Sequence, residues 1–167
     1  WSDRGRARAN GGVIRIARGE DPGDSFVASI ADYGKALELD PGSSRALLAR
    51  GQARGESGVY RMHRGEDPEE FFAAAAADFG RALELTPASA EAWRSRGMVC
   101  VNWAAFGKAR RADREELSAA AVADLSRALE LDRASADTWK NRGLARANWA
   151  GYKAARGSDP EELITAA

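Results

Sequence analysis

The residues of this chain recur with a period of 46 from one end to the other. One register position holds Trp1, Leu47, Trp93 and Trp139, and the segments 32–41, 78–87 and 124–133 read DYGKALELDP, DFGRALELTP and DLSRALELDR. A fixed period of this size is typical of solenoids, because a single repeat cannot bury its apolar face alone and must stack on its neighbours. This period constrains the fold more than any other feature of the sequence.

The period divides the chain into repeats at 1–46, 47–92 and 93–138, followed by a partial repeat at 139–167. We expect these repeats to form one continuous solenoid domain. The chain opens on Trp1, inside a repeat and without an initiator methionine, and it ends inside the fourth repeat. We therefore interpret it as a piece of a longer protein.

Each repeat carries the signals of two helices. In the second repeat, serines precede an apolar stretch, Gly65 follows it, and Asp67-Pro68 begins a second amphipathic stretch that Pro87 closes. Serine and aspartate favour helix starts, proline the first turn, and glycine the position after a helix. No segment alternates with a period of two, so the sequence predicts an all-α fold. The expected helices cover 1–18, 22–40, 44–64, 68–86, 90–110, 114–132 and 136–156.

The pattern resembles the tetratricopeptide repeat (TPR) family, whose signature is W-x2-L-G-x2-Y, then A-x3-F and a proline. Trp93 and Gly97 fit the first part, and Ala75, Phe79 and Pro87 fit the second. The resemblance implies an α-solenoid of stacked antiparallel hairpins in a right-handed superhelix. Each repeat is about 12 residues longer than the family's 34, which adds an extra layer to every hairpin. The chain also departs from the family at two register positions: the Leu before Gly is Arg throughout, and the Tyr is Arg8, Arg54, Cys100 or Arg146.

Composition excludes several classes of function. The chain has 25 basic and 25 acidic residues and no net charge, which argues against nucleic acid or a membrane surface as partner. No apolar run approaches the roughly 18–20 residues that span a membrane. Cys100 and His63 lie in different repeats, without the spacing of a metal site or of a nucleophile and its base. We expect no catalytic residues, metal or cofactor, and the sequence gives no indication of compartment.

Arginine and aspartate recur 28 residues apart in the first three repeats, as Arg4 and Asp32, Arg50 and Asp78, and Arg96 and Asp124. The arginines could form a row of anion sites. Alternatively, each arginine forms a partly buried salt bridge to the aspartate of its own hairpin. The equal periodicity of both partners favours the structural bridge.

The family resemblance implies that the first helix of each repeat lines a concave groove for a protein or peptide partner. The groove residues would be Leu48, Gln52, Arg94, Met98, Val101, Lys140 and Leu144. This set lacks the Lys–Asn pattern with which the family clamps the C-terminal carboxylates of chaperones. Trp103 and Trp149 stand where the first two repeats have Gly11 and Ser57. They are either surface anchors for a partner or space-filling residues of the extra layer.

Three functional hypotheses follow. The first is a non-catalytic scaffold that binds a peptide or protein partner in the groove. The second is self-assembly, in which solenoid ends that carry Trp1, Leu163 and Ile164 stack head to tail into a fibre or ring. The third is an accessory region of a larger bacterial enzyme.

Overall fold

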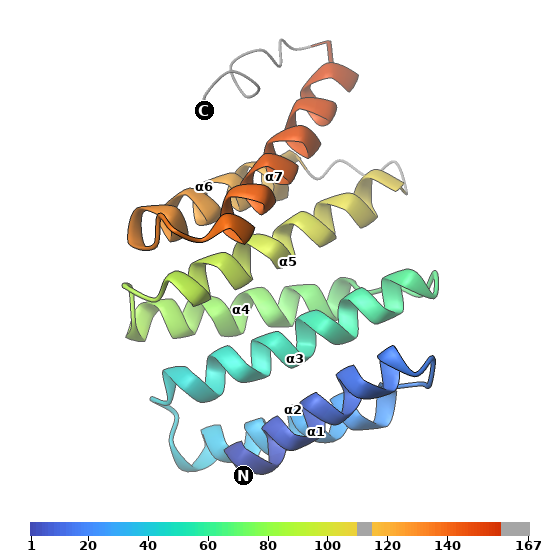
Figure 1. The fold of residues 1–167 in the computed structure, drawn as a ribbon, viewed down its shortest axis with the longest axis vertical. Helices are drawn as coiled ribbons and strands as arrows, with labels where there is room; N and C mark the ends of the chain where they lie inside the picture. The colour runs from blue at the N-terminus through green and yellow to red at the C-terminus, as the bar shows by residue number, and fades with distance from the viewer. Residues whose placement is uncertain (110–114, 158–167) are drawn as a thin grey trace. The chain divides into compact units, whose positions relative to one another are not determined.

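In the computed structural model, residues 1–109 and 115–157 are described, and they form seven α-helices and no β-strand (Figure 1). The all-α prediction is confirmed. The helices are α1 (Ser2–Ala17), α2 (Gly23–Leu39), α3 (Ser44–His63), α4 (Glu69–Leu85), α5 (Ala90–Ala109), α6 (Glu115–Leu131) and α7 (Ala136–Ala155). Their ends agree with the predicted ends to within one residue. We call the first helix of each repeat (α1, α3, α5 and α7) an A helix and the second (α2, α4 and α6) a B helix.

The chain divides into two compact units, Trp1–Pro87 and Ala88–Ala167. In the first unit, α1 packs on α2, α2 on α3 and α3 on α4, and the two A helices also touch. In the second unit, α5 packs on α6, α6 on α7, and the A helices α5 and α7 are again in contact. Each unit is thus built from helices that stack in chain order, as in a helical solenoid.

The hairpin turns use glycine and aspartate as the sequence predicts. Gly65 ends α3 with φ of 75°, a conformation that glycine adopts without strain. The amide of Glu66 donates to the carbonyl of Arg61 at 2.9 Å, which caps the last turn. Asp67 Oδ1 then accepts a hydrogen bond at 2.9 Å from the amide of Glu69, the first residue of α4.

Glycines on the A helices let the two helices of a hairpin approach closely. A β-carbon on Gly51 would lie 2.7 Å from the ring of Phe79, and one on Gly58 would lie 2.6 Å from the ring of Phe72. Both phenylalanines are fully buried. The helical glycines therefore serve packing between helices A and B, and the burial of the aromatic rings offsets their low helix propensity.

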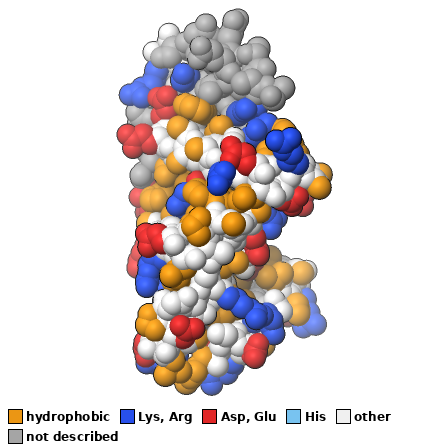
Figure 2. All heavy atoms as spheres, turned by 90° about the vertical axis from the view of Figure 1, so that its left-hand side faces the viewer, with side chains coloured by type: hydrophobic (Ala, Val, Ile, Leu, Met, Phe, Trp, Pro, Cys, Tyr) orange, Lys and Arg blue, Asp and Glu red, His pale blue; other side chains and the backbone are white. Residues whose placement is uncertain are grey.

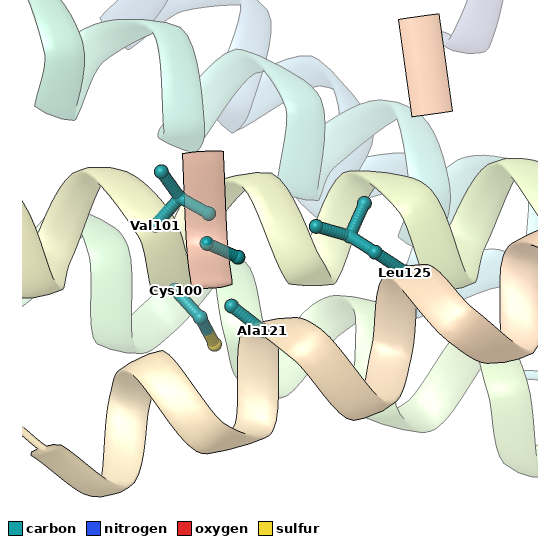
Figure 3. Packing of buried hydrophobic residues seen from close by; sticks show 5 residues of the cluster. Cys100, Val101, Ala121 and Leu125 are labelled. Atoms are coloured by element: carbon teal, nitrogen blue, oxygen red, sulfur yellow. The ribbon is translucent and has the colours of Figure 1, made fainter. Parts of the chain in front are cut away.

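One groove prediction is wrong, because Val101 belongs to the core. It is 2% exposed and packs with Cys100, Ala121, Leu125 and Ala145. Figure 3 shows Cys100 and Val101 of α5 beside Ala121 and Leu125 of α6. The turn of α5 that carries Val101 thus faces the other helices of its unit, and the side chain is not available to a partner.

Candidate functional site

The structure brings the predicted arginine and aspartate partners together inside each hairpin. Arg50 donates to both carboxylate oxygens of Asp78, from Nε at 2.9 Å and from Nη2 at 2.6 Å. The Asp78 side chain is only 3% exposed. The bond geometry is bidentate, which fixes the orientation of both side chains. The same two bonds join Arg4 to Asp32 and Arg96 to Asp124.

A second arginine, which the sequence analysis did not assign, binds the same carboxylate in two hairpins. Arg54 donates to Asp78 at 2.6 Å and to the carbonyl of Ala74 at 3.3 Å, and Arg8 makes the equivalent bonds to Asp32 and Ala28. These arginines replace the tyrosine of the family signature, and this departure was the available signal. The guanidinium groups are held by internal carboxylates and carbonyls. The recurring arginines therefore hold the two helices of each hairpin together and do not form a row of anion sites.

Hydrogen bonds and burial shift the pKa values of several groups in these hairpins. The hydrogen bonds from Arg4 hold the pKa of the Asp32 carboxyl below its usual value. In the second hairpin, burial is the main cause that lowers the pKa of Arg54, and neighbouring Arg50 acts in the same direction. In the third hairpin, Cys100 stands in place of the second arginine, and burial raises the pKa of its thiol to about 11.

The remaining predicted groove residues lie on A helices in the two units. Leu48 and Gln52 are partly exposed on α3, and Arg94 and Met98 are partly exposed on α5. On α7, Lys140 is exposed, and Leu144 is 49% exposed. Each unit therefore presents polar and apolar side chains together on its A helices.

The two candidate anchor tryptophans are both half-buried. The indole Nε1 of Trp149 donates to Glu115 Oε1 of α6 at 3.1 Å, and the Lys153 ammonium lies 5.5 Å from the centre of its ring system. Arg156 also donates to Glu115, at 2.8 Å. Trp149 is thus engaged within its own unit, as expected of a residue that fills the extra layer.

The predicted end-to-end contact residues fall into two groups. Trp1 is 53% exposed, and the guanidinium of Arg4 covers one face of its ring at 4.2 Å. Leu163 and Ile164 lie outside the described residues. Leu47 occupies the register position of Trp1 one repeat later, but it is fully buried against Leu37 and Ala82.

A pocket that the sequence analysis missed lies in the extra layer of the first unit, with a volume of about 140 Å³. The start of α2 and the last turns of α3 form most of it. Its wall includes Phe26, Val27, Ser57, Tyr60 and Phe71. The one signal in the sequence was Ser57, which stands where two other repeats have tryptophan.

The charges around this pocket balance. Arg61 and Arg64 line it together with Asp21 and Glu66. Arg64 donates to Glu66 at 2.7 Å, and the Arg61 guanidinium lies over the ring of Phe71 at 4.7 Å. The basic groups are therefore already engaged by a carboxylate and an aromatic ring, so a neutral ligand suits the pocket better than an anion.

Other kinds of site are not found in the described part of the chain. Within residues 1–109 and 115–157, no cluster of three or more His, Cys, Asp or Glu could hold a metal ion. Across those ranges, no helix has both the length and the apolar character that crossing a membrane requires. Acidic, basic and hydrophobic side chains are interspersed over the face shown in Figure 2.

The structure is similar to that of a known repeat domain. No protein-family model matches the sequence, and no curated protein matches it either. Among solved structures, the first TPR of Spaghetti (RPAP3), bound to the HSP90 peptide SRMEEVD, superposes with a TM-score of 0.53 at 20% identity. The match covers 87% of this chain and 96% of that chain. The chain therefore has the fold of a tetratricopeptide repeat domain, and the predicted resemblance is confirmed at the level of the fold.

Proposed function

We propose that this chain is a non-catalytic scaffold that binds a segment of a partner protein along its A helices. The observation that carries the proposal is the fold shared with a TPR domain that holds a peptide. The A helices of this chain offer partly exposed side chains for such contacts, among them Leu48 and Gln52 on α3 and Leu144 on α7.

One stripe on α3 is the best-defined part of this surface. Leu48, Gln52, Glu56 and Tyr60 are four residues apart, so they lie along one side of the helix, and none is buried. The stripe begins with an apolar side chain, continues through polar ones and ends on an aromatic ring. Interfaces draw most of their free energy from a few apolar and aromatic anchors with polar contacts around them.

The composition of the A helices favours an internal segment over an acidic C-terminus as the partner. Clamping two carboxylates needs paired basic and amide side chains on successive A helices. At the corresponding places this chain has Arg94 with Met98 and Lys140 with Leu144. Each pair combines one charge with one apolar side chain, which suits a mixed segment of a partner protein.

A selection experiment tests the proposal. Twelve-residue peptides displayed on phage are selected against the chain, and their affinities are measured by calorimetry, with SRMEEVD as the acidic comparator. We expect Leu48→Arg to weaken binding by about tenfold or more, because it removes an apolar anchor. Leu39→Arg, at a leucine that is 76% exposed on a B helix, is the matched control. An equal loss in the control variant would overturn the proposal, and tight binding of SRMEEVD alone would contradict the preference for an internal segment.

Self-association is a second candidate, because α1 exposes several large apolar side chains. Val13, Ile14 and Ile16 are 46%, 51% and 43% exposed. Large apolar side chains exposed near one another on a helix can mark an interface between proteins. Light scattering over a wide concentration range decides the matter: association that Ile14→Glu abolishes supports this candidate, and a monomer at every concentration excludes it.

A further inference from the structure

The pocket in the extra layer has walls suited to an aromatic ligand. Phe26, Tyr60 and Phe71 all line it. Phe26 is 1% exposed, and Tyr60 and Phe71 are half-buried. Val27 is 61% exposed at the edge. Aromatic rings prefer offset or edge-to-face contact with other rings, so such walls favour a ring over an aliphatic chain of equal size.

The second unit shows what occupies the equivalent place. Trp149 occupies the register position of Ser57 two repeats later, and Glu115 occupies the position of Gly23. There the Trp149 indole donates to Glu115 at 3.1 Å, and Lys153, the counterpart of Arg61, lies 5.5 Å from the ring. Within the second unit, the chain itself supplies an aromatic ring between the start of its B helix and the end of its A helix.

In the first unit the same place is open, because serine is much smaller than tryptophan. Ser57 is buried, and its hydroxyl donates to the carbonyl of Ala53 in its own helix at 2.9 Å. The side chain therefore leaves the space next to it unfilled. The open volume of about 140 Å³ matches the roughly 150 Å³ of a protein cavity that holds one benzene molecule. The pocket thus has room for one aromatic ring.

We propose that this pocket binds a single aromatic side chain of the partner. The ring enters between α2 and α3 and takes the place that Trp149 fills in the second unit. The pocket lies at the Tyr60 end of the α3 stripe, so an occupied pocket would anchor a segment bound along that stripe. The identity of the partner rests on the proposed function, but the preference of the pocket for a ring does not.

Capped amino acids test the pocket directly. The chain labelled with ¹⁵N is titrated with N-acetyl-L-tryptophanamide, N-acetyl-L-phenylalaninamide and N-acetyl-L-leucinamide, while the amide signals of Gly23, Val27 and Ser57 are followed. We expect saturable shifts at these amides, with the leucine compound about fivefold weaker than the aromatic ones. Equal responses to all three compounds, or shifts elsewhere only, would overturn the proposal.

Substitutions in and near the pocket test where the capped amino acids bind. Ser57→Trp installs the residue of two other repeats and is expected to abolish the shifts at Gly23 and Val27. If that variant does not fold, Val27→Glu puts a charge at the edge of the pocket, and Leu39→Glu on the same helix is the control. Retained binding in Val27→Glu, or equal loss in both variants, would contradict the assignment. Leu48→Arg leaves the pocket intact, so failure of peptide binding and failure of the pocket are separate results.

Discussion

Arg50 and Asp78 are joined by two hydrogen bonds across the second hairpin, of 2.9 Å and 2.6 Å, and the carboxylate is 3% exposed. Arg54 adds a third bond to the same group at 2.6 Å. Two guanidinium groups thus depend on one buried carboxylate. Its removal leaves both without their charge partner, a loss that is far more costly than that of an exposed ion pair.

The first prediction follows from this dependence. Asp78→Ala is expected to lower the free energy of unfolding by about 3–5 kcal/mol, as is typical when one partner of a buried ion pair is removed. Denaturation by urea measures the change. Glu38→Ala is the control, because its bond to Lys35 is exposed and is worth about 0–1 kcal/mol. Similar small losses in both variants would show that the buried bridge does not stabilise the hairpin.

The second prediction concerns the close approach of α3 to α4. Gly58→Ala would place a β-carbon 2.6 Å from the fully buried Phe72 ring, and the resulting overpacking should destabilise the fold by about 1–3 kcal/mol. Gly11→Ala meets nothing within 4 Å and should stabilise the fold by about 1 kcal/mol through helix propensity. Thermal unfolding of both variants checks the opposite signs. A stabilised Gly58→Ala variant would contradict the packing.

The third prediction is a dependence of stability on pH. The Asp32 carboxyl has a pKa below its ordinary value because Arg4 hydrogen-bonds to it. The unfolded chain therefore binds a proton at this carboxyl more tightly than the folded chain does. The stabilisation that the Arg4–Asp32 bridge gives the folded state is fully present above about pH 5 and is lost as the pH falls through the folded pKa. Urea unfolding from pH 7 to pH 3 should show a smaller loss for Asp32→Asn than for the exposed control Asp3→Asn. Parallel curves would count against a depressed Asp32 pKa.

The fourth prediction concerns the reactivity of Cys100. The thiol is 6% exposed, and burial raises its pKa to about 11, so only about one molecule in a thousand carries the reactive thiolate at pH 8. A disulfide reagent that reports free thiols should react slowly with the native chain and fully after denaturation in guanidinium. Rapid reaction of the native chain would place Cys100 at the surface.

Local signals in the sequence explain why the helices could be predicted. Gly65 and Asp67 act within one turn of chain, so the break between α3 and α4 is visible without knowledge of the fold. The bridge between Arg50 and Asp78 was also predictable, because both residues recur with the same period. These features needed only the repeat and the chemistry of neighbouring residues.

Three features depended on tertiary structure. Val101 was placed in the groove by its register in the family, but it lies in the core with Cys100 and Leu125. The third bond to Asp78 required knowing that Arg54, one turn after Arg50, still reaches the same carboxylate. The pocket is a space left by the small side chain of Ser57, and a missing side chain becomes visible only when the surrounding helices are in place.

The most direct test of the central claim maps a bound peptide onto the chain. A peptide selected by display is added to the ¹⁵N-labelled chain, and the change at every assigned backbone amide is measured. The proposed function predicts that the largest shifts fall on A helices, with Leu48 and Gln52 of α3 among the residues most affected. Shifts confined to the B helices α2, α4 and α6, with the A-helix signals unchanged, would contradict it.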